Sequence, residues 1–102
     1  LIIRGVNVFP TQIEEQILKC AGLAPHFLIE LARSGRMDTM TVHVECTPDM
    51  ATEDARAKSA KELGHHIKSV VGVTTRIEVR DPNTVARSEG KAKRVVDNRP
   101  KE

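Results

Sequence analysis

The sequence contains very few aromatic residues: Phe9 and Phe27 are the only two, with no Trp or Tyr. Proteins that bind single strands of nucleic acid stack the bases on aromatic side chains, so this scarcity argues against nucleic-acid binding. A formal net charge of +2 gives no support to a nucleic-acid or membrane-surface role either. No apolar run approaches the ~20 residues of a membrane-spanning helix. We therefore expect neither partner.

Cysteine is equally scarce, and Cys20 and Cys46 do not form a C-x-x-C pair. Two cysteines are too few for a disulfide framework, so we expect small buried thiols in a reducing compartment, with a cytoplasmic location. Neighbouring side chains in a helix point about 100° apart, so His65 and His66 cannot bind one metal ion together. No metal site is predicted, and His26 and His43 show no partner in the sequence.

The pattern of apolar residues predicts one α+β domain. Met40, Val42 and Val44 alternate with polar residues, as in a half-buried strand. Thr11 and Glu14 have the spacing of a capping box at a helix start. Strands are predicted at 1–8, 26–32, 40–46 and 75–80, a turn at 33–36, helices at 10–22 and 52–72, and a short edge strand at 94–96. This βαββαβ order is the split βαβ, ferredoxin-like arrangement, with two helices on one face of a mainly antiparallel sheet.

The two ends of the chain differ from the middle. Leu1 begins an apolar run without a starting Met, so we expect the chain to be a piece of a longer polypeptide. The segment 85–102 holds six basic residues against three acidic ones. Such a tail either meets an anion, of which phosphate is the commonest, or is a solvated terminus. The expected organisation is a core at 1–83 and a functional loop and tail at 84–102.

Two stretches carry a resemblance to a known family. Residues 2–14 read IIRGVNVFPTQIE, and residues 87–97 read RSEGKAKRVVD. Together they resemble the C-terminal domain of the adenylate-forming ligase superfamily, in its phenylacetate–CoA ligase branch. The resemblance implies a mobile lid domain that works with an N-terminal adenylation domain of the same chain. ATP and coenzyme A would be substrates with an aryl carboxylic acid, AMP and diphosphate would be released, and Mg²⁺ would accompany ATP in the N-terminal domain.

The resemblance also implies roles for particular residues. Lys91 matches the catalytic lysine of acyl-adenylate formation, and an ammonium group suits the charge that develops at the reacting phosphate. Arg87, Ser88 and Gly90 are expected to shape the nucleotide loop. Coenzyme A is expected to pass a channel formed by Arg4, Gly5, Val6 and Asn7. From the residues alone, a simple bulge in an edge strand is the favoured interpretation of Gly5.

Departures and alternatives remain. The hinge aspartate and the ATP-binding motifs of the family are absent from these 102 residues, so the fragment is expected to be inactive alone. Val85-Ala86 stands where the family often has a proline, which leaves the rigidity of the lysine loop open. The alternative function is a ferredoxin-like regulatory module that binds a small molecule and pairs with a second copy.

Overall fold

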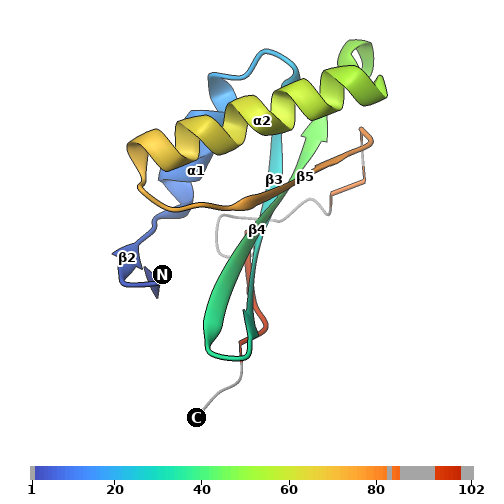
Figure 1. The fold of residues 1–102 in the computed structure, drawn as a ribbon. Helices are drawn as coiled ribbons and strands as arrows, with labels where there is room; N and C mark the ends of the chain where they lie inside the picture. Colours follow the sequence, from blue (N-terminus) through green and yellow to red (C-terminus); the bar gives the residue numbers. More distant parts are fainter. Residues whose placement is uncertain (1, 83, 86–93, 100–102) are drawn as a thin grey trace.

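The computed structural model describes residues 2–82, 84–85 and 94–99. The chain folds into two helices, a four-stranded sheet and a separate two-stranded hairpin (Figure 1). The elements in order are β1 (Ile2–Ile3), β2 (Val6–Asn7), α1 (Pro10–Leu18), β3 (Leu23–Ser34), β4 (Met37–Cys46), the 3-10 helix η1 (Pro48–Met50), α2 (Glu53–Val70), β5 (Arg76–Arg80) and β6 (Val95–Asp97).

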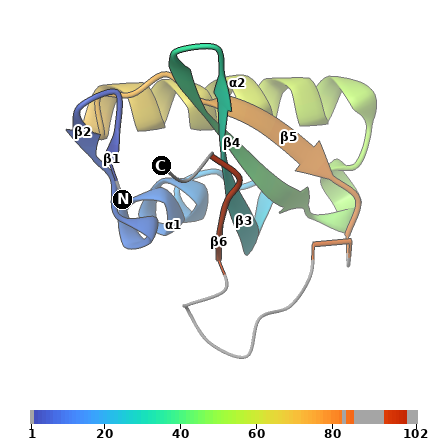
Figure 2. The same ribbon diagram turned by 90° about the horizontal axis from the view of Figure 1, so that it is seen from below.

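The main sheet has the strand order β5-β4-β3-β6. Strands β3 and β4 form a long antiparallel hairpin, whereas β4 pairs with β5 and β3 pairs with β6 in parallel. The sheet is therefore mixed and not mainly antiparallel. The α+β class and the short edge strand near Val95 are confirmed. Figure 2 shows β6 beside β3, at the edge opposite to β5.

The first predicted strand, at 1–8, is wrong in its placement. Ile2–Ile3 pairs with Val6–Asn7 in a hairpin of its own and does not join the main sheet. Arg4 and Gly5 have φ angles of 47° and 79°, and this left-handed conformation reverses the direction of the chain directly after Ile3. The position beside β3 is filled by β6 instead.

The core lies between one face of the sheet and both helices. Opposed pairs such as Ile29–Val42 and Leu31–Met40 have buried side chains that point toward the helices. Ile13 and Ile17 of α1, together with Leu63 and Ile67 of α2, belong to the same buried cluster. Each such side chain contributes about 1.5–3 kcal/mol on burial. The prediction that both helices cover one face of the sheet is confirmed.

The helix ends follow local rules, with one correction. Thr52 Oγ1 accepts a hydrogen bond from the Ala55 backbone at 3.2 Å, so the predicted cap of the second helix is confirmed. At the first helix the predicted Thr11–Glu14 capping box is wrong. The helix begins at Pro10, as expected, but its N-cap is Phe9, and Gln12 Oε1 accepts from the Phe9 backbone N–H at 3.0 Å.

Gly22, which was expected to close the first helix, has another role. Helix α1 ends at Leu18. A Cβ atom at Gly22 would lie 2.7 Å from Ser59 Oγ, so the absence of a side chain lets this loop pack closely against α2. Within the described part of the chain, no helix combines the length and apolar character needed to cross a membrane.

Candidate functional site

The β1–β2 turn holds the predicted channel residues. Ile3 pairs with Val6, so Arg4 and Gly5 are the two central residues of the turn. Both have positive φ, as a type I′ turn requires. A Cβ atom added at Gly5 would meet nothing within 4 Å, so the space outside the turn is open. The turn replaces the edge-strand bulge that the sequence allowed for Gly5.

Arg4 is an unusual residue for this turn. Type I′ turns favour Asn-Gly, and a non-glycine residue in the left-handed region is disfavoured by roughly 1–2 kcal/mol. Arg4 Nε donates a hydrogen bond to the backbone oxygen of Asp38 at 3.0 Å. This bond joins the turn to the tip of the β3–β4 hairpin, 34 residues further along the chain. Backbone strain of this kind occurs often at functional sites.

Asp38 is held by two arginines. Its carboxylate accepts from Arg33 Nε at 2.8 Å and from Arg99 Nη1 at 3.0 Å. The hydrogen bond from Arg33, followed by that from Arg99, holds the pKa of the Asp38 carboxyl below its usual range, although partial burial acts in the opposite direction. The Asp38 carboxylate therefore carries a negative charge whose position is fixed by its ion pairs with Arg33 and Arg99.

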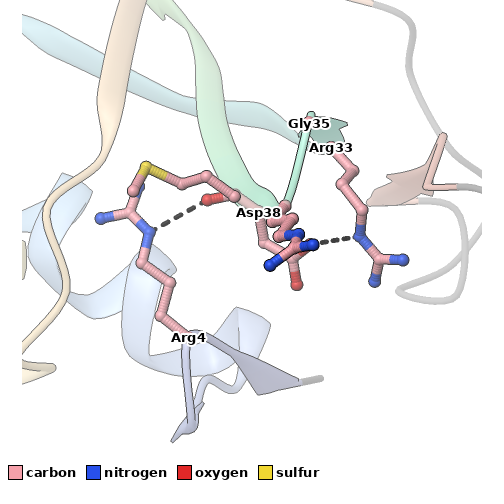
Figure 3. Close-up of a pocket in the computed structure, with 6 residues that line it drawn as sticks. Arg4, Arg33, Gly35 and Asp38 are labelled. Carbon is pink, nitrogen blue, oxygen red and sulfur yellow. Dashed lines mark hydrogen bonds and ion pairs between the residues drawn. The ribbon is translucent and has the colours of Figure 1, made fainter.

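An open depression of about 490 Å³ lies between the turn and the hairpin tip. Figure 3 shows Arg4 and Arg33 on opposite sides of Asp38, with Gly35 at the tip. The residues that line the depression are Arg4, Arg33, Gly35, Arg36, Met37 and Asp38. Three arginines and one aspartate line it, so the depression carries a surplus of positive charge. Guanidinium groups match the geometry of phosphate oxygens, and an anionic group of that kind fits here.

Arg33 and Arg36 were missed as site residues. The sequence marks Arg33-Ser34-Gly35-Arg36 only as a turn, and the positive φ of Gly35 agrees with that prediction. The available signal was the pair of arginines that flank the turn. This signal points to a site only once the structure places Arg4 beside the same depression.

Arg99 ties the end of the described chain to the same place. Its guanidinium donates to Asp38, to the backbone oxygen of Ile2 at 2.9 Å and to Asp97 at 2.8 Å. These bonds with Arg99 hold the pKa of the Asp97 carboxyl down at about 2. The β1–β2 turn, the β3–β4 tip and β6 thus form one connected polar cluster.

The predicted lysine loop lies outside the described residues. Arg87, Ser88, Gly90 and Lys91 all fall in the segment 86–93. The structure describes the residues on both sides of this segment, and both are anchored to the sheet.

On one side, the Val85 backbone N–H donates to Glu45 Oε2 at 3.0 Å, and both residues are buried. On the other side, the backbone oxygen of Arg94 accepts from the Ile29 N–H at 2.7 Å. The Arg94 guanidinium pairs with Glu14 at 2.5 Å and lies 5.0 Å from the centre of the Phe27 ring. The loop therefore starts and ends at fixed points.

His43 has partners that the sequence did not reveal. Its Nε2 lies 2.8 Å from Glu30 Oε1, and its Nδ1 lies 2.9 Å from Arg80 Nη2. Arginine can only donate, so Nδ1 is the acceptor and Nε2 carries the hydrogen toward Glu30. The bond to His43 is the main reason that the pKa of Glu30 is lowered.

His43 also lines a depression of about 270 Å³ together with Leu28, Arg80, Thr84 and Val85. This depression therefore lies beside Val85, the last described residue before the segment 86–93 that holds Lys91.

The comparisons with known proteins agree on one group. Residues 5–99 match the family model of the AMP-binding enzyme C-terminal domain. The sequence is 50% identical over 106 residues to phenylacetate-coenzyme A ligase of Aromatoleum evansii, covering 100% of this chain and 24% of that protein. It is 45% identical to the enzyme of the same name from Escherichia coli K12, covering 97% of this chain and 23% of that protein. The chain thus spans about a quarter of the length of these relatives.

Solved structures give the same picture. The fold matches 2-hydroxyisobutyryl-CoA ligase in complex with 2-HIB-AMP and CoA in the thioesterification state, with a TM-score of 0.89 and 31% identity over 97% of this chain and 21% of that one. It also matches a domain of phenylacetate-coenzyme A ligase from Bacteroides vulgatus, with a TM-score of 0.86 and 32% identity, covering 98% of this chain and 92% of that one.

Proposed function

Because the chain belongs to the family of AMP-binding enzyme C-terminal domains, we propose that it acts as the mobile lid of an AMP-forming aryl-acid CoA ligase in the cytoplasm. The complete enzyme would join an acid and ATP to an acyl-adenylate with release of diphosphate. It would then transfer the acyl group to coenzyme A and release AMP. The names of the relatives support phenylacetate as the acid. The acid pocket and the Mg²⁺ that accompanies ATP belong to the N-terminal domain in this proposal.

The observation that carries the proposal is the joining of the Arg4-Gly5 turn to the arginine-lined depression. Coenzyme A has two parts with different needs. Its pantetheine arm needs a narrow path with backbone groups for its amides, and the open side of Gly5 offers that path beside Val6 and Asn7. Its phosphates need fixed cations, which Arg4, Arg33 and Arg36 supply. Both features lie side by side in the fold, because Arg4 of the turn also lines the depression.

The first half-reaction is assigned to the lysine loop. Lys91 would bring its ammonium group to the α-phosphate as the carboxylate attacks, with Arg87, Ser88 and Gly90 shaping the approach. The anchors at Val85 and Arg94 support this role, because a loop with fixed ends can deliver one side chain to a defined place. The whole of 1–102 would move as one lid, with 84–102 carrying this loop and the tail.

Kinetics of the complete enzyme test this division of work. Lys91→Ala should slow acyl-adenylate formation, measured as acid-dependent exchange of diphosphate into ATP, by on the order of 10²–10⁴. The conversion of pre-formed acyl-adenylate to the thioester should change far less. If both half-reactions fall equally, or neither falls, Lys91 does not have this role.

The comparisons with known proteins do not favour the regulatory alternative, which makes a different prediction. A regulatory module would bind a small molecule as an isolated domain and would form a stable dimer. Equilibrium titration with amino acids, together with sedimentation of the 102-residue chain, tests for both. Specific binding by a dimer would favour the regulator over the lid.

A further inference from the structure

Three side chains with metal-binding atoms converge where the end of α1 meets α2. The thiol sulfur of Cys20, a carboxylate oxygen of Glu62 and a ring nitrogen of His66 all lie within 4.8 Å of one another. Cys20 follows α1, while Glu62 and His66 lie four residues apart on one face of α2. Nε2 of His66 is 3.8 Å from Oε1 of Glu62. None of the three lines the arginine-lined depression, and none lies in the segment 86–93 that holds Lys91.

We propose that Cys20, Glu62 and His66 bind a divalent transition-metal ion, with Zn²⁺ as the best fit. Sulfur, imidazole nitrogen and carboxylate oxygen are the three ligand types that zinc takes in proteins, whereas Mg²⁺ and Ca²⁺ take oxygen ligands. A tetrahedral ion with bonds of ~2.0–2.3 Å holds its ligand atoms roughly 3.5 Å apart. The Glu62–His66 distance is already near this value, and the full cluster needs to contract by about 1 Å.

The Cys20 thiol is protonated when no ion is bound. Burial, and then the neighbouring Glu62 carboxylate, raise the pKa of the Cys20 thiol to about 11. Without an ion the thiol keeps its proton, and Sγ lies 3.5 Å from the backbone oxygen of Gln16, to which it donates. A bound cation takes the place of that proton, which leaves for solvent, and its positive charge then lies beside both the thiolate and the Glu62 carboxylate.

The exposure of the three side chains shows from which side an ion can reach them. The Cys20 side chain is buried, whereas the side chains of Glu62 and His66 are 43% and 34% exposed, so an ion can enter from solvent on the α2 side. Three protein ligands leave a fourth position for water. The ion would join the end of α1 to the middle of α2, which are the two helices that cover the core. It would therefore stabilise the domain without taking part in the ligase reaction.

Titration of the 102-residue chain with Co²⁺ tests the site directly. Co²⁺ takes the same geometry as zinc, and a cysteine ligand gives a thiolate-to-cobalt absorption in the near ultraviolet. We expect one equivalent to bind with this absorption, Zn²⁺ to displace it, and saturating Zn²⁺ to raise the unfolding temperature by on the order of 5 °C. A folded chain that shows neither binding nor a thiolate band would overturn the proposal.

Three variants identify the ligands. Cys20→Ser should abolish the thiolate band; if the band persists, the sulfur ligand is Cys46 and the proposed site is wrong. His66→Ala should weaken Co²⁺ binding by roughly tenfold or more, whereas His65→Ala, one position along α2 and outside the cluster, should bind as the unaltered chain does. Both histidines lie on the outside of α2, so this pair decides the question even if Cys20→Ser does not fold. Equal effects of the two histidine variants would contradict the assignment.

Discussion

Arg4 Nε donates a hydrogen bond to the backbone oxygen of Asp38 at 3.0 Å, and this bond joins the turn at the start of the chain to the tip of the β3–β4 hairpin. Arg99 reaches the same aspartate from the other end of the chain. Three segments far apart in the sequence are therefore joined by polar contacts, in addition to the packing of Ile3, Met40 and Val95 in or against the apolar core. The strength of an ion pair depends on pH, because protonation of the carboxylate removes its charge.

The polar cluster should weaken in acid. The pKa of Asp97 is about 2 and that of Asp38 is lowered, whereas an aspartate in the unfolded chain has a pKa of ~3.9. A carboxyl whose pKa is depressed by folding stabilises the folded state above the unfolded pKa, and the effect is lost as pH falls through the folded pKa. We expect the unfolding temperature of the chain to drop between about pH 4 and pH 2.

A variant separates this effect from general acid unfolding. In Asp97→Asn the drop in unfolding temperature over that pH range should be smaller, because one of the two titrating groups has gone. Asp49→Asn, an exposed position in η1, is the matched control and should follow the unaltered chain. An Asp97→Asn curve parallel to that of the unaltered chain would show that the Asp97–Arg99 pair adds nothing to stability.

The arginine-lined depression should set the affinity for coenzyme A. Arg36→Ala in the complete ligase should raise the KM for coenzyme A roughly tenfold, the size of one lost charge-assisted hydrogen bond, with little change in acyl-adenylate formation. Lys58→Ala, an exposed cation on α2, should leave that KM unchanged. Repeating both measurements with dephospho-coenzyme A shows which phosphate is bound, since an arginine that contacts the 3′-phosphate has no effect there. An unchanged KM in Arg36→Ala would remove the depression from the binding site.

Much of the fold could be predicted from the sequence because it is encoded locally. The alternation of Met40, Val42 and Val44 predicts a strand whatever it pairs with, and Thr52 caps its helix with a neighbour three residues away. The segment Ile2–Asn7 was placed wrongly because a short apolar run reads alike as one long strand or as a hairpin. The left-handed conformation of Arg4, which decides between them, is rare for arginine and has no signal in composition.

The candidate site was only partly predictable, for a related reason. Gly5 was found through the family resemblance. Arg33 and Arg36 could be recognised as site residues only because they line one depression with Arg4, and His43 only because it contacts Arg80. Such contacts are set by strand register and sheet order, which no local pattern reports. The cluster of Cys20 with Glu62 and His66 was missed in the same way, since it depends on how α1 packs on α2.

Gln16 carries the clearest stability prediction. This residue of α1 is 1% exposed, and its side-chain oxygen has no hydrogen-bond partner among the described residues. A buried polar atom without a partner costs about 1–3 kcal/mol. Gln16→Met keeps the length of the side chain and removes the polar atoms, so it should raise the free energy of unfolding, by roughly 1 kcal/mol, in urea denaturation of the chain. A loss of stability instead would mean that the amide has a partner in the folded protein.

The central claim is that the open side of Gly5 is a passage for coenzyme A, and one substitution separates this from a need for the turn alone. Asparagine adopts the left-handed conformation readily, so Gly5→Asn should keep the β1–β2 turn and the unfolding temperature while placing a side chain in the passage. The decisive measurement is the rate at which the complete Gly5→Asn ligase converts pre-formed acyl-adenylate to thioester. We predict a loss of at least about tenfold with acyl-adenylate formation intact; a thioester rate equal to that of the unaltered enzyme would show that Gly5 serves only the turn.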